Sequence, residues 1–323
     1  MNKIIKKALI CGVSGQDGAY LSAFLLKKGY QVFGGSRDAQ ANAFRNLHVL
    51  NIFKSINLVS INLCDFRSVL QVITQIQPDE IYNLSGQSSV GLSFDQPVET
   101  MESIGIATLN ILEAIRFSKL NIKFYNAGSS ECFGETGTIA ANENTPFKPK
   151  SPYGVAKAMS YWTVSNYREA YNLFACTGIL FNHESPLRPQ RFVTSKIIST
   201  ICKIAKGENI KLSLGNIEIS RDWGWAPEYV EAMWLMLQLN EPEDFVIATG
   251  RTFPLKDFIK YGFNYLNLNW EDYLESNPEL YRPTDLSAGY ADPSKANTIL
   301  GWKAKYFMED IIREMIDYQM KTS

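Results

Sequence analysis

Two side chains in the middle of the chain have the types and the spacing needed for proton transfer. Tyr153 and Lys157 are four residues apart, so on a helix they lie on one face, about one turn apart. A nearby ammonium stabilises a phenolate and lowers the pKa of the tyrosine toward working pH. The pair therefore predicts a general base that takes a proton from a substrate hydroxyl.

A glycine-rich turn near the N-terminus predicts a dinucleotide site. Glycines recur at every third position from 12 to 18, directly after a short apolar run. Glycine lets the backbone approach a pyrophosphate, and the N–H groups of the following helix face that group. We expect this turn to bind the cofactor through Gly12, Ser14, Gly15, Gln16, Asp17 and Gly18.

The end of the next apolar segment bears on which dinucleotide is bound. Residues 33–38 end in Arg37 and Asp38, and the usual ribose-binding acid is absent from the last strand positions. An arginine at this place accommodates the 2′-phosphate of NADP. Arg37 therefore favours NADP, and the alternative is a solvated Arg37 beside an Asp38 that binds a ribose.

The hydrophobic pattern predicts an α/β fold built on a doubly wound parallel sheet, because strands alternate with helices. We expect strands at 8–11, 31–33, 58–61, 81–84, 123–126 and 174–181, and helices that include 66–76, 98–117 and 151–171. Residues 1–181 are expected to form the dinucleotide-binding domain with the catalytic residues. Residues 182–323 are expected to form a smaller, α-rich part that binds the substrate, with the chain crossing back to the sheet.

The composition excludes several other classes of protein. Lys and Arg number 32 and Asp and Glu 33, so the net charge of -1 argues against binding nucleic acid or an anionic membrane by bulk charge. Two histidines and five scattered cysteines provide no dense metal site. No apolar run reaches the roughly 18 residues of a membrane span. We expect a soluble, cytoplasmic protein without a metal.

Several stretches together resemble one enzyme family. Besides the glycine turn and the Tyr153–Lys157 pair, they are Ala127-Gly128-Ser129-Ser130-Glu131, Asn182-His183-Glu184-Ser185-Pro186, Arg221-Asp222-Trp223-Gly224 and Tyr281-Arg282-Pro283-Thr284. From about residue 7 to the C-terminal helix, the chain resembles the extended short-chain dehydrogenase/reductases, and among them the GDP-mannose 4,6-dehydratase family of nucleotide-sugar 4,6-dehydratases.

The resemblance implies a catalytic set and a reaction. Ser129 stands where the family has its catalytic threonine, which hydrogen-bonds the sugar O4, and Ser130 and Glu131 follow in register. Tyr153 would deprotonate O4 as hydride leaves C4, and Glu131 would remove the C5 proton before water leaves from C6. The hydride then returns to C6, so no net oxidation occurs and the cofactor stays bound.

The resemblance also implies binding residues. Those for the cofactor are Asn62, Leu63, Leu84, Ser85 and His183, and those for the GDP-sugar are Ser88, Asn182, Val193, Lys196, Arg221 and Arg282. We expect His183 to be a hydrogen-bonding residue beside the pocket rather than a general acid. The alternative for the two arginines is surface pairing of Arg221 and Arg282 with Asp222 and Asp285.

Departures from the family pattern bear on the sugar. They are Ser129 for threonine, Ser195 for the arginine before Lys196, Pro189 for glycine, Asn62 for aspartate and Ser85-Gly86 for two alanines. Because these changes cluster on the sugar side, they favour GDP-N-acetylglucosamine slightly over GDP-mannose as substrate. In the family, GDP-N-acetylglucosamine 4,6-dehydratase starts a route to legionaminic acid.

Two other functions remain open from the residues alone. A C4 dehydrogenase or epimerase on the same fold would keep Tyr153 and Lys157 but would not need Glu131. A non-enzymatic NADP-sensing protein would commonly lose the Tyr-x-x-x-Lys pair, which is present here. The family pattern also predicts a homodimer through helices 98–117 and 151–171, with a tetramer as the larger option.

Overall fold

A seven-stranded parallel sheet forms the centre of the computed structural model, which describes residues 5–322. The strand order is β10-β6-β5-β4-β1-β2-β3, so the chain winds outward in both directions from β1. The strands are β1 (Lys7–Cys11), β2 (Gln31–Ser36), β3 (Asn57–Ser60), β4 (Glu80–Asn83), β5 (Lys123–Ala127), β6 (Ala175–Leu180) and β10 (Phe245–Ile247). This confirms the predicted doubly wound sheet.

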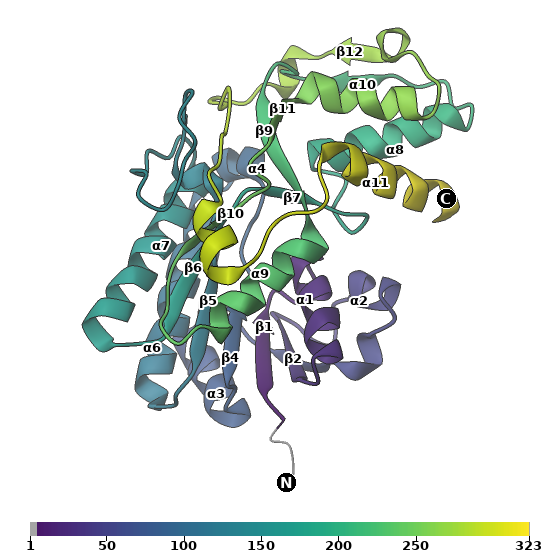
Figure 1. Ribbon diagram of the computed structural model, residues 1–323. Coiled ribbons are helices and arrows are strands. Elements are labelled where there is room, and N and C mark those ends of the chain that lie inside the picture. The colour runs from purple at the N-terminus through teal and green to yellow at the C-terminus, as the bar shows by residue number, and fades with distance from the viewer. Residues whose placement is uncertain (1–4, 323) are drawn as a thin grey trace.

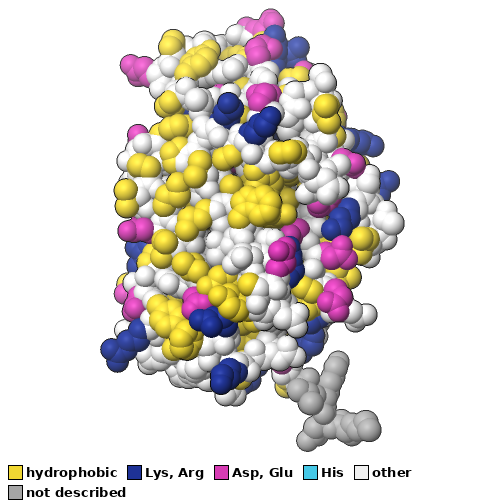
Figure 2. Space-filling model, turned by 90° about the vertical axis from the view of Figure 1, so that its left-hand side faces the viewer, with side chains coloured by type: hydrophobic (Ala, Val, Ile, Leu, Met, Phe, Trp, Pro, Cys, Tyr) yellow, Lys and Arg dark blue, Asp and Glu magenta, His cyan; other side chains and the backbone are white. Residues whose placement is uncertain are grey.

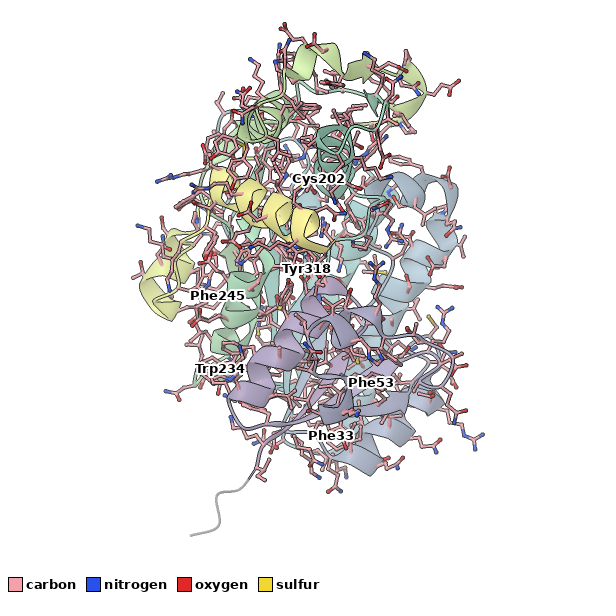
Figure 3. All side chains as sticks on the ribbon, turned by 90° about the vertical axis from the view of Figure 1, so that its right-hand side faces the viewer. Phe33, Phe53, Cys202, Trp234, Phe245 and Tyr318 are labelled. Carbon is pink, nitrogen blue, oxygen red and sulfur yellow. The ribbon has the colours of Figure 1, made fainter. Side chains whose placement is uncertain are left out.

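Helices cover both faces of this sheet, as Figure 1 shows. One face packs against α3 (Phe66–Ile76), α6 (Ala107–Ser118) and α7 (Pro152–Tyr171), and the other against α1 (Gln16–Lys27) and α9 (Ala226–Gln238). On the second face, Trp234 of α9, which Figure 3 labels, packs edge-on against Phe24 of α1 at 5.7 Å between ring centroids. Both faces are thus closed to water, which suits a parallel sheet.

A smaller part sits beyond the carboxyl edge of the sheet (Figure 1). Its core is formed by α8 (Val193–Ala205), α10 (Leu255–Tyr265) and α11 (Met308–Thr322). A three-stranded sheet has the order β11 (Thr252–Pro254), β9 (Ser220–Trp225) and β7 (Asn182–Glu184), and a two-stranded one joins β8 (Leu212–Leu214) and β12 (Leu274–Ser276). Although α9 and β10 come late in the chain, they belong to the layers around the large sheet.

The remaining elements are short. They are the α-helices α2 (Arg45–Val49), α4 (Val90–Asp95) and α5 (Pro97–Met101), the 3-10 helices Phe53–Ser55, Ser130–Cys132, Trp270–Asp272 and Pro278–Leu280, and the π-helical turns Glu102–Ile106 and Ala296–Leu300. Within residues 5–322, no helix is both long enough and apolar enough to cross a membrane.

The predicted helix over 98–117 was wrong in one respect, because a π-helical turn separates α5 from α6. Gly105 lies in this turn, and a Cβ there would meet the sulfur of Met159 on α7 at 2.5 Å. The glycine therefore permits a close approach of the two segments that an ordinary side chain would prevent. The turn adjusts the register of the helix to that contact.

The N-terminus of α7 and its contacts with the sheet position two residues of the site, Tyr153 and Lys157. Ser151 caps the helix by accepting a hydrogen bond from the Gly154 N–H at 3.1 Å, and Pro152 occupies the first turn. Farther along, Arg168 donates two hydrogen bonds, of 2.9 and 2.7 Å, to the carboxylate of Asp244, which immediately precedes β10. The same carboxylate accepts from the Thr177 N–H of β6 at 2.6 Å. The helix is thereby fixed to the edge of the sheet.

Candidate active site

The carboxyl ends of β4, β5 and β6 open into a large cleft of about 350 Å³. Its opposite wall comes from the smaller part: the segment before α8, the N-terminus of that helix, β9 and the loop around residues 280–285. In open α/β sheets, ligands bind at this edge. The cleft therefore lies between the residues predicted for catalysis and those predicted to bind the substrate.

Ser129 and Glu131 enter the cleft directly after β5. Gly128 leaves the strand by donating to the Gly178 carbonyl at 2.8 Å, and Ser129 then caps the short helix Ser130–Cys132 by accepting from the Glu131 N–H at 3.3 Å. Both Ser129 and Glu131 line the cleft, whereas Ser130 is not among the lining residues. Of this predicted trio, the structure thus brings two side chains to the site.

Tyr153 and Lys157 reach the same cleft from the first turns of α7. Both are buried and line it, with the Lys157 Nζ 5.8 Å from the centroid of the Tyr153 ring. The ammonium donates to the Ala127 carbonyl at the end of β5, at 2.7 Å. That hydrogen bond holds this face of α7 against the end of β5, which Ser129 follows. The positions of Tyr153 and Lys157 relative to Ser129 are thereby fixed.

Burial dominates the protonation of this pair. It raises the pKa of Tyr153, while a hydrogen bond with Ser129 lowers it. Burial also lowers the pKa of Lys157 to about 8. The expected depression of the tyrosine pKa is therefore absent from the chain by itself, since Lys157 does not offset the loss of solvation. A positively charged ligand beside the ring would stabilise the phenolate and so lower the pKa of Tyr153.

Glu131 has the electrostatic environment of a proton acceptor. Burial raises its pKa above the ordinary value of 4.5, and the positive charges of Arg221 and Arg282 partly oppose that rise. Asp285 adds to the rise. A carboxylate with a raised pKa is a stronger base than a solvated one. Glu131 therefore suits removal of a weakly acidic carbon-bound proton.

The two arginines line the cleft and share one carboxylate. Arg221 Nη2 lies 3.2 Å and Arg282 Nη1 3.6 Å from Asp285 Oδ1. The alternative in which Arg221 pairs with Asp222 was wrong, because Asp222 accepts instead from the backbone N–H groups of residues 249–251. Arg221 is also held by the carbonyl of Leu286 at 2.9 Å. Both guanidinium groups face a space that a diphosphate would fill.

The other predicted substrate residues also lie on the cleft wall, namely Ser88, Asn182, Val193 and Lys196. Lys196 donates to the Ser213 carbonyl at 2.7 Å, which directs its ammonium along the wall. Ser88 accepts from Arg191 at 3.4 Å across the mouth of the cleft. The structure therefore gathers residues from 88 to 282 that are far apart in sequence.

Sequence reasoning missed three charged residues of the site: Glu184, Arg188 and Arg191. Arg188 Nε lies 3.1 Å from the buried Glu184 Oε2, and its guanidinium lies over the Phe192 ring at 3.9 Å. The signal that could have found them is a cluster of charged residues in the loop between β7 and α8, shortly after the strand β6 ends at the sheet's carboxyl edge.

The glycine turn has the close packing that a dinucleotide site needs. A Cβ at Gly18 would meet the Gly12 carbonyl oxygen at 2.3 Å, and one at Gly12 would meet the Leu84 carbonyl oxygen at 2.8 Å. Gly15 is the N-cap of α1 and provides no side-chain cap, so the first N–H groups of the helix remain available to an anion. These residues fit a pyrophosphate.

The predicted cofactor residues fall into two groups. Asp17, Leu84, Ser85, Tyr153, Lys157 and His183 line the cleft, whereas Gly12, Ser14, Gly15, Gln16, Gly18, Arg37, Asn62 and Leu63 do not. Arg37 directly follows β2, and Asn62 follows β3 and accepts from the Cys64 N–H at 3.2 Å. Because β2 and β3 are neighbours of β1, this second group continues along the same edge of the sheet.

His183 hydrogen-bonds beside the pocket, as its context predicted. Its Nε2 lies 2.9 Å from Asp17 and its Nδ1 2.8 Å from the carbonyl of Phe181. The side chain thereby joins β7 to the glycine turn.

Comparisons with known proteins agree with this geometry. The model of the family described as GDP-mannose 4,6 dehydratase matches residues 9–315. GDP-mannose 4,6 dehydratase 1 of Arabidopsis thaliana is 44% identical over 98% of this chain and 90% of its own length. The GDP-mannose 4,6 dehydratase of Homo sapiens is 41% identical over 98% of this chain and 92% of its own length.

Solved structures show the same fold at lower identity. The dTDP-glucose 4,6-dehydratase of Bacillus anthracis, in complex with NAD, has a TM-score of 0.86 at 17% identity and covers 98% of this chain, with 97% of its own chain matched. RMD from Pseudomonas aeruginosa, complexed with NADPH, has a TM-score of 0.81 at 18% identity, with 98% of this chain and 100% of that chain covered. With the family model matched over residues 9–315 and relatives 41–44% identical over 98% of its length, the chain belongs to the GDP-mannose 4,6 dehydratase family.

Proposed function

We propose that this protein is an NADP-dependent GDP-hexose 4,6-dehydratase, which converts a GDP-hexose to the GDP-4-keto-6-deoxy-hexose. The observation that carries the proposal is the convergence of Ser129, Glu131, Tyr153 and Lys157 in one cleft that also holds Arg221 and Arg282. The first four residues can move protons at a sugar, and the two arginines can bind a diphosphate.

Tyr153 and Ser129 act at the sugar O4. Ser129 is hydrogen-bonded to Tyr153, so an O4 hydroxyl placed between them meets both a donor and a base. Tyr153 takes the O4 proton, and Lys157 stabilises the resulting phenolate from the same helix face. When bound, NADP supplies the redox chemistry by accepting a hydride from C4 and later returning it to C6.

Glu131 acts at the adjacent carbons. Oxidation at C4 makes the C5–H bond acidic, and the carboxylate of Glu131 takes this proton. The protonated Glu131 then donates this proton to the C6 hydroxyl, which leaves as water. The C5 proton and the C6 hydroxyl leave together as water, so the atoms balance without a second redox substrate.

The environment of residues 37 and 38 supports NADP over NAD. Asp38 Oδ1 accepts from the backbone N–H groups of Gln40 and Ala41 at 2.8 and 2.9 Å, which closes a turn. That carboxylate oxygen is already engaged, which disfavours the alternative in which Asp38 binds a ribose. Arg37 is exposed beside it. We expect NADP to bind at least tenfold more tightly than NAD in calorimetry, and tighter binding of NAD would overturn this assignment.

Two hexoses are candidates, each with its own support. The relatives are named for GDP-mannose. GDP-N-acetylglucosamine is favoured by Ser129 on the cleft wall, where the family pattern has a threonine. Serine lacks the methyl group of threonine, which leaves room for a bulkier C2 substituent.

The proposed reaction is tested by incubating the purified protein with NADP and each GDP-sugar in deuterated water. We expect a 4-keto-6-deoxy product in NMR spectra, with solvent deuterium at C5 and loss of the C6 hydroxyl. A C4 dehydrogenase or epimerase would keep that hydroxyl, and this result would overturn the proposal. Comparing the initial rates for GDP-mannose and GDP-N-acetylglucosamine identifies the hexose.

We further propose that the protein acts as a homodimer through α5, α6 and α7. These helices pack against one another and expose large apolar side chains, among them Val98 (69% exposed), Trp162 (60%) and Phe117 (59%). Figure 2 looks onto the side of the molecule where α6 and α7 lie and shows hydrophobic side chains scattered over much of it. The expected cytoplasmic location and the division at residues 181/182 stay predictions.

A further inference from the structure

The ring of His183 has a hydrogen-bond acceptor at each nitrogen. Nδ1 lies 2.8 Å from the Phe181 carbonyl oxygen, and Nε2 lies 2.9 Å from Asp17 Oδ2. A neutral imidazole carries only one N–H, so it can donate to only one of these oxygens. The imidazolium donates to both. The geometry therefore favours a positive charge on His183 when Asp17 is ionised.

The pair is enclosed by groups from several elements. His183 is buried and stacks on Tyr229 of α9 with ring centroids 4.6 Å apart. The other oxygen of Asp17 accepts from Gln16 at 3.0 Å. The charged or titratable groups that act on the two partners are Tyr20 of α1, Tyr125 of β5, Lys157 of α7, Arg188 and Tyr229. Of these, Arg188 opposes the charge on His183.

The pair also joins the two walls of the cleft. Gln16, at the start of α1, donates to the His183 carbonyl at 3.2 Å and accepts from Ser185 at 2.7 Å. His183 lies in β7, which pairs with β9 so that His183 is opposite Gly224. Arg221 lies on that same strand. Hydrogen bonds thus join the glycine turn to β7, and β7 pairs with β9, the strand that carries Arg221.

We propose that Asp17 and protonated His183 form a positioning ion pair that couples the dinucleotide turn to the nucleotide-sugar wall, so that losing the proton weakens the binding of both ligands. The identity of the two ligands rests on the proposed function, whereas the ion pair is a property of the chain alone. His183 acts here as a positioning residue through Asp17 and β7, and not as a proton donor to substrate.

The sign of the pH dependence follows from the two opposing influences on His183. Burial lowers its pKa, while the charge and hydrogen bond of Asp17 raise it, and the outcome is a pKa above the ordinary value of 6.5. A group whose folded pKa is raised contributes its full stabilisation below its unfolded pKa. The contribution is lost as the pH rises through the folded pKa. Above that value, only one ring nitrogen keeps its N–H, and the lone pair of the other faces an oxygen.

The protonation state can be read directly, because the chain has only two histidines. His48 is exposed and stacks on Phe53 at 4.2 Å, outside the cleft. In a His48→Gln variant, every imidazole NMR signal belongs to His183. We expect both ring nitrogens to be protonated at pH values below 6.5 and the ring to titrate above 6.5. Adding Asp17→Asn should lower that pKa. A wild-type pKa at or below 6.5 would overturn the proposal.

The coupling is tested with Asp17→Asn, His183→Gln and the double variant. Calorimetry measures NADP binding, and steady-state kinetics measures KM and kcat for the GDP-sugar across pH. We expect each single change to weaken NADP binding about tenfold and to raise KM more than it lowers kcat. The double variant should recover most of the loss, because two neutral amides can hydrogen-bond to each other, and it should lose the decline in binding at high pH.

Tyr229→Phe is the matched control. It keeps the ring that stacks on His183 and removes a hydroxyl that has no hydrogen-bond partner among residues 5–322, so the decline at high pH should persist. Additive losses in the double variant would refute the coupling. Absence of turnover by the wild type with any GDP-sugar contradicts the proposed function instead, and the NMR titration still decides the ion pair.

Discussion

At the residue scale, the proposed chemistry depends on a carboxylate whose neighbours change its pKa in opposite directions. Burial raises the pKa of Glu131, Arg221 and Arg282 lower it, and Asp285 raises it again. The same arginines are the groups that we propose bind a diphosphate. Binding and base strength are therefore linked, since any change in these charges alters both.

Glu131→Gln should separate the two halves of the reaction. The amide keeps the size of the side chain but cannot take the C5 proton, so we expect product formation to fall by roughly 100-fold to 10,000-fold. Oxidation at C4 should survive and should be seen as absorbance of bound NADPH. Tyr153→Phe is the matched variant, because it should abolish that absorbance as well. Full dehydratase activity in Glu131→Gln would remove the residue from the mechanism.

The acid limb of the kcat–pH profile should report the pKa of Glu131. Because the base is active when ionised and its pKa is raised above 4.5, activity should fall as the pH drops through that raised value. Arg282→Gln removes an opposing cation and should move the limb to higher pH. Asp285→Asn removes an anion and should move it to lower pH.

Arg251→Gln provides the control for this pair of shifts. Its guanidinium lies over the Phe307 ring at 3.8 Å and is not part of the cleft wall. We expect no displacement of the acid limb in this variant. Shifts of the same sign in Arg282→Gln and Asp285→Asn would show that some other group controls the limb.

At the element scale, the turn between β1 and α1 depends on close backbone packing. A Cβ at Gly18 would lie 2.3 Å from the Gly12 carbonyl oxygen and 2.7 Å from the Val13 Cα, and neither neighbour is a flexible side-chain end. The helix must therefore start against the strand with no side chain between them. That contact fixes the direction of the helix N-terminus toward the cofactor.

Gly18→Ala should accordingly impair cofactor binding while the rest of the fold persists. We expect NADP affinity to fall at least tenfold in calorimetry, and the melting temperature to drop, because the turn must open to admit the methyl group. Gly289→Ala makes the same chemical change where the nearest atom would lie 3.9 Å away, so it should bind NADP normally. Equal affinity in both variants would contradict the packing argument.

At the scale of the whole molecule, the exposed apolar side chains of α5, α6 and α7 form the surface where we propose that a second copy binds. Val155 and Trp162 are seven residues apart on α7 and therefore share one face of the helix. The same helix carries Tyr153 and Lys157, which line the cleft. A second copy packed there would hold the catalytic helix from its outer side.

Trp162→Asp should convert the proposed dimer to a monomer, since a buried unpaired carboxylate is costly in an apolar interface. Light scattering of the wild type should give twice the chain mass of 36.5 kDa, and that of the variant should give the chain mass. Ile299→Asp is the control, because this residue is 45% exposed but lies outside α5, α6 and α7. A wild-type monomer would refute the dimer.

Much of the large sheet could be predicted because its signals are local. The strand-turn-helix pattern around residues 8–27 and the cap at Ser151 each depend on neighbours within a few residues. The smaller part was harder to predict. Its strands are short, and β7 and β11 find their partner β9 about 40 and 30 residues away along the chain. No local periodicity carries that information.

The sequence by itself determined the glycine turn and the family, and it predicted the candidate catalytic side chains, because each is a matter of residue type at a fixed spacing. Only the tertiary structure decided which charges meet. It paired Arg221 with Asp285 and not Asp222, added Arg188 and Arg191 to the cleft, and placed an acceptor at each nitrogen of His183. Coulombic and hydrogen-bonding energies depend on distance in space, and segments far apart in the chain acquire their distances only when the core is packed.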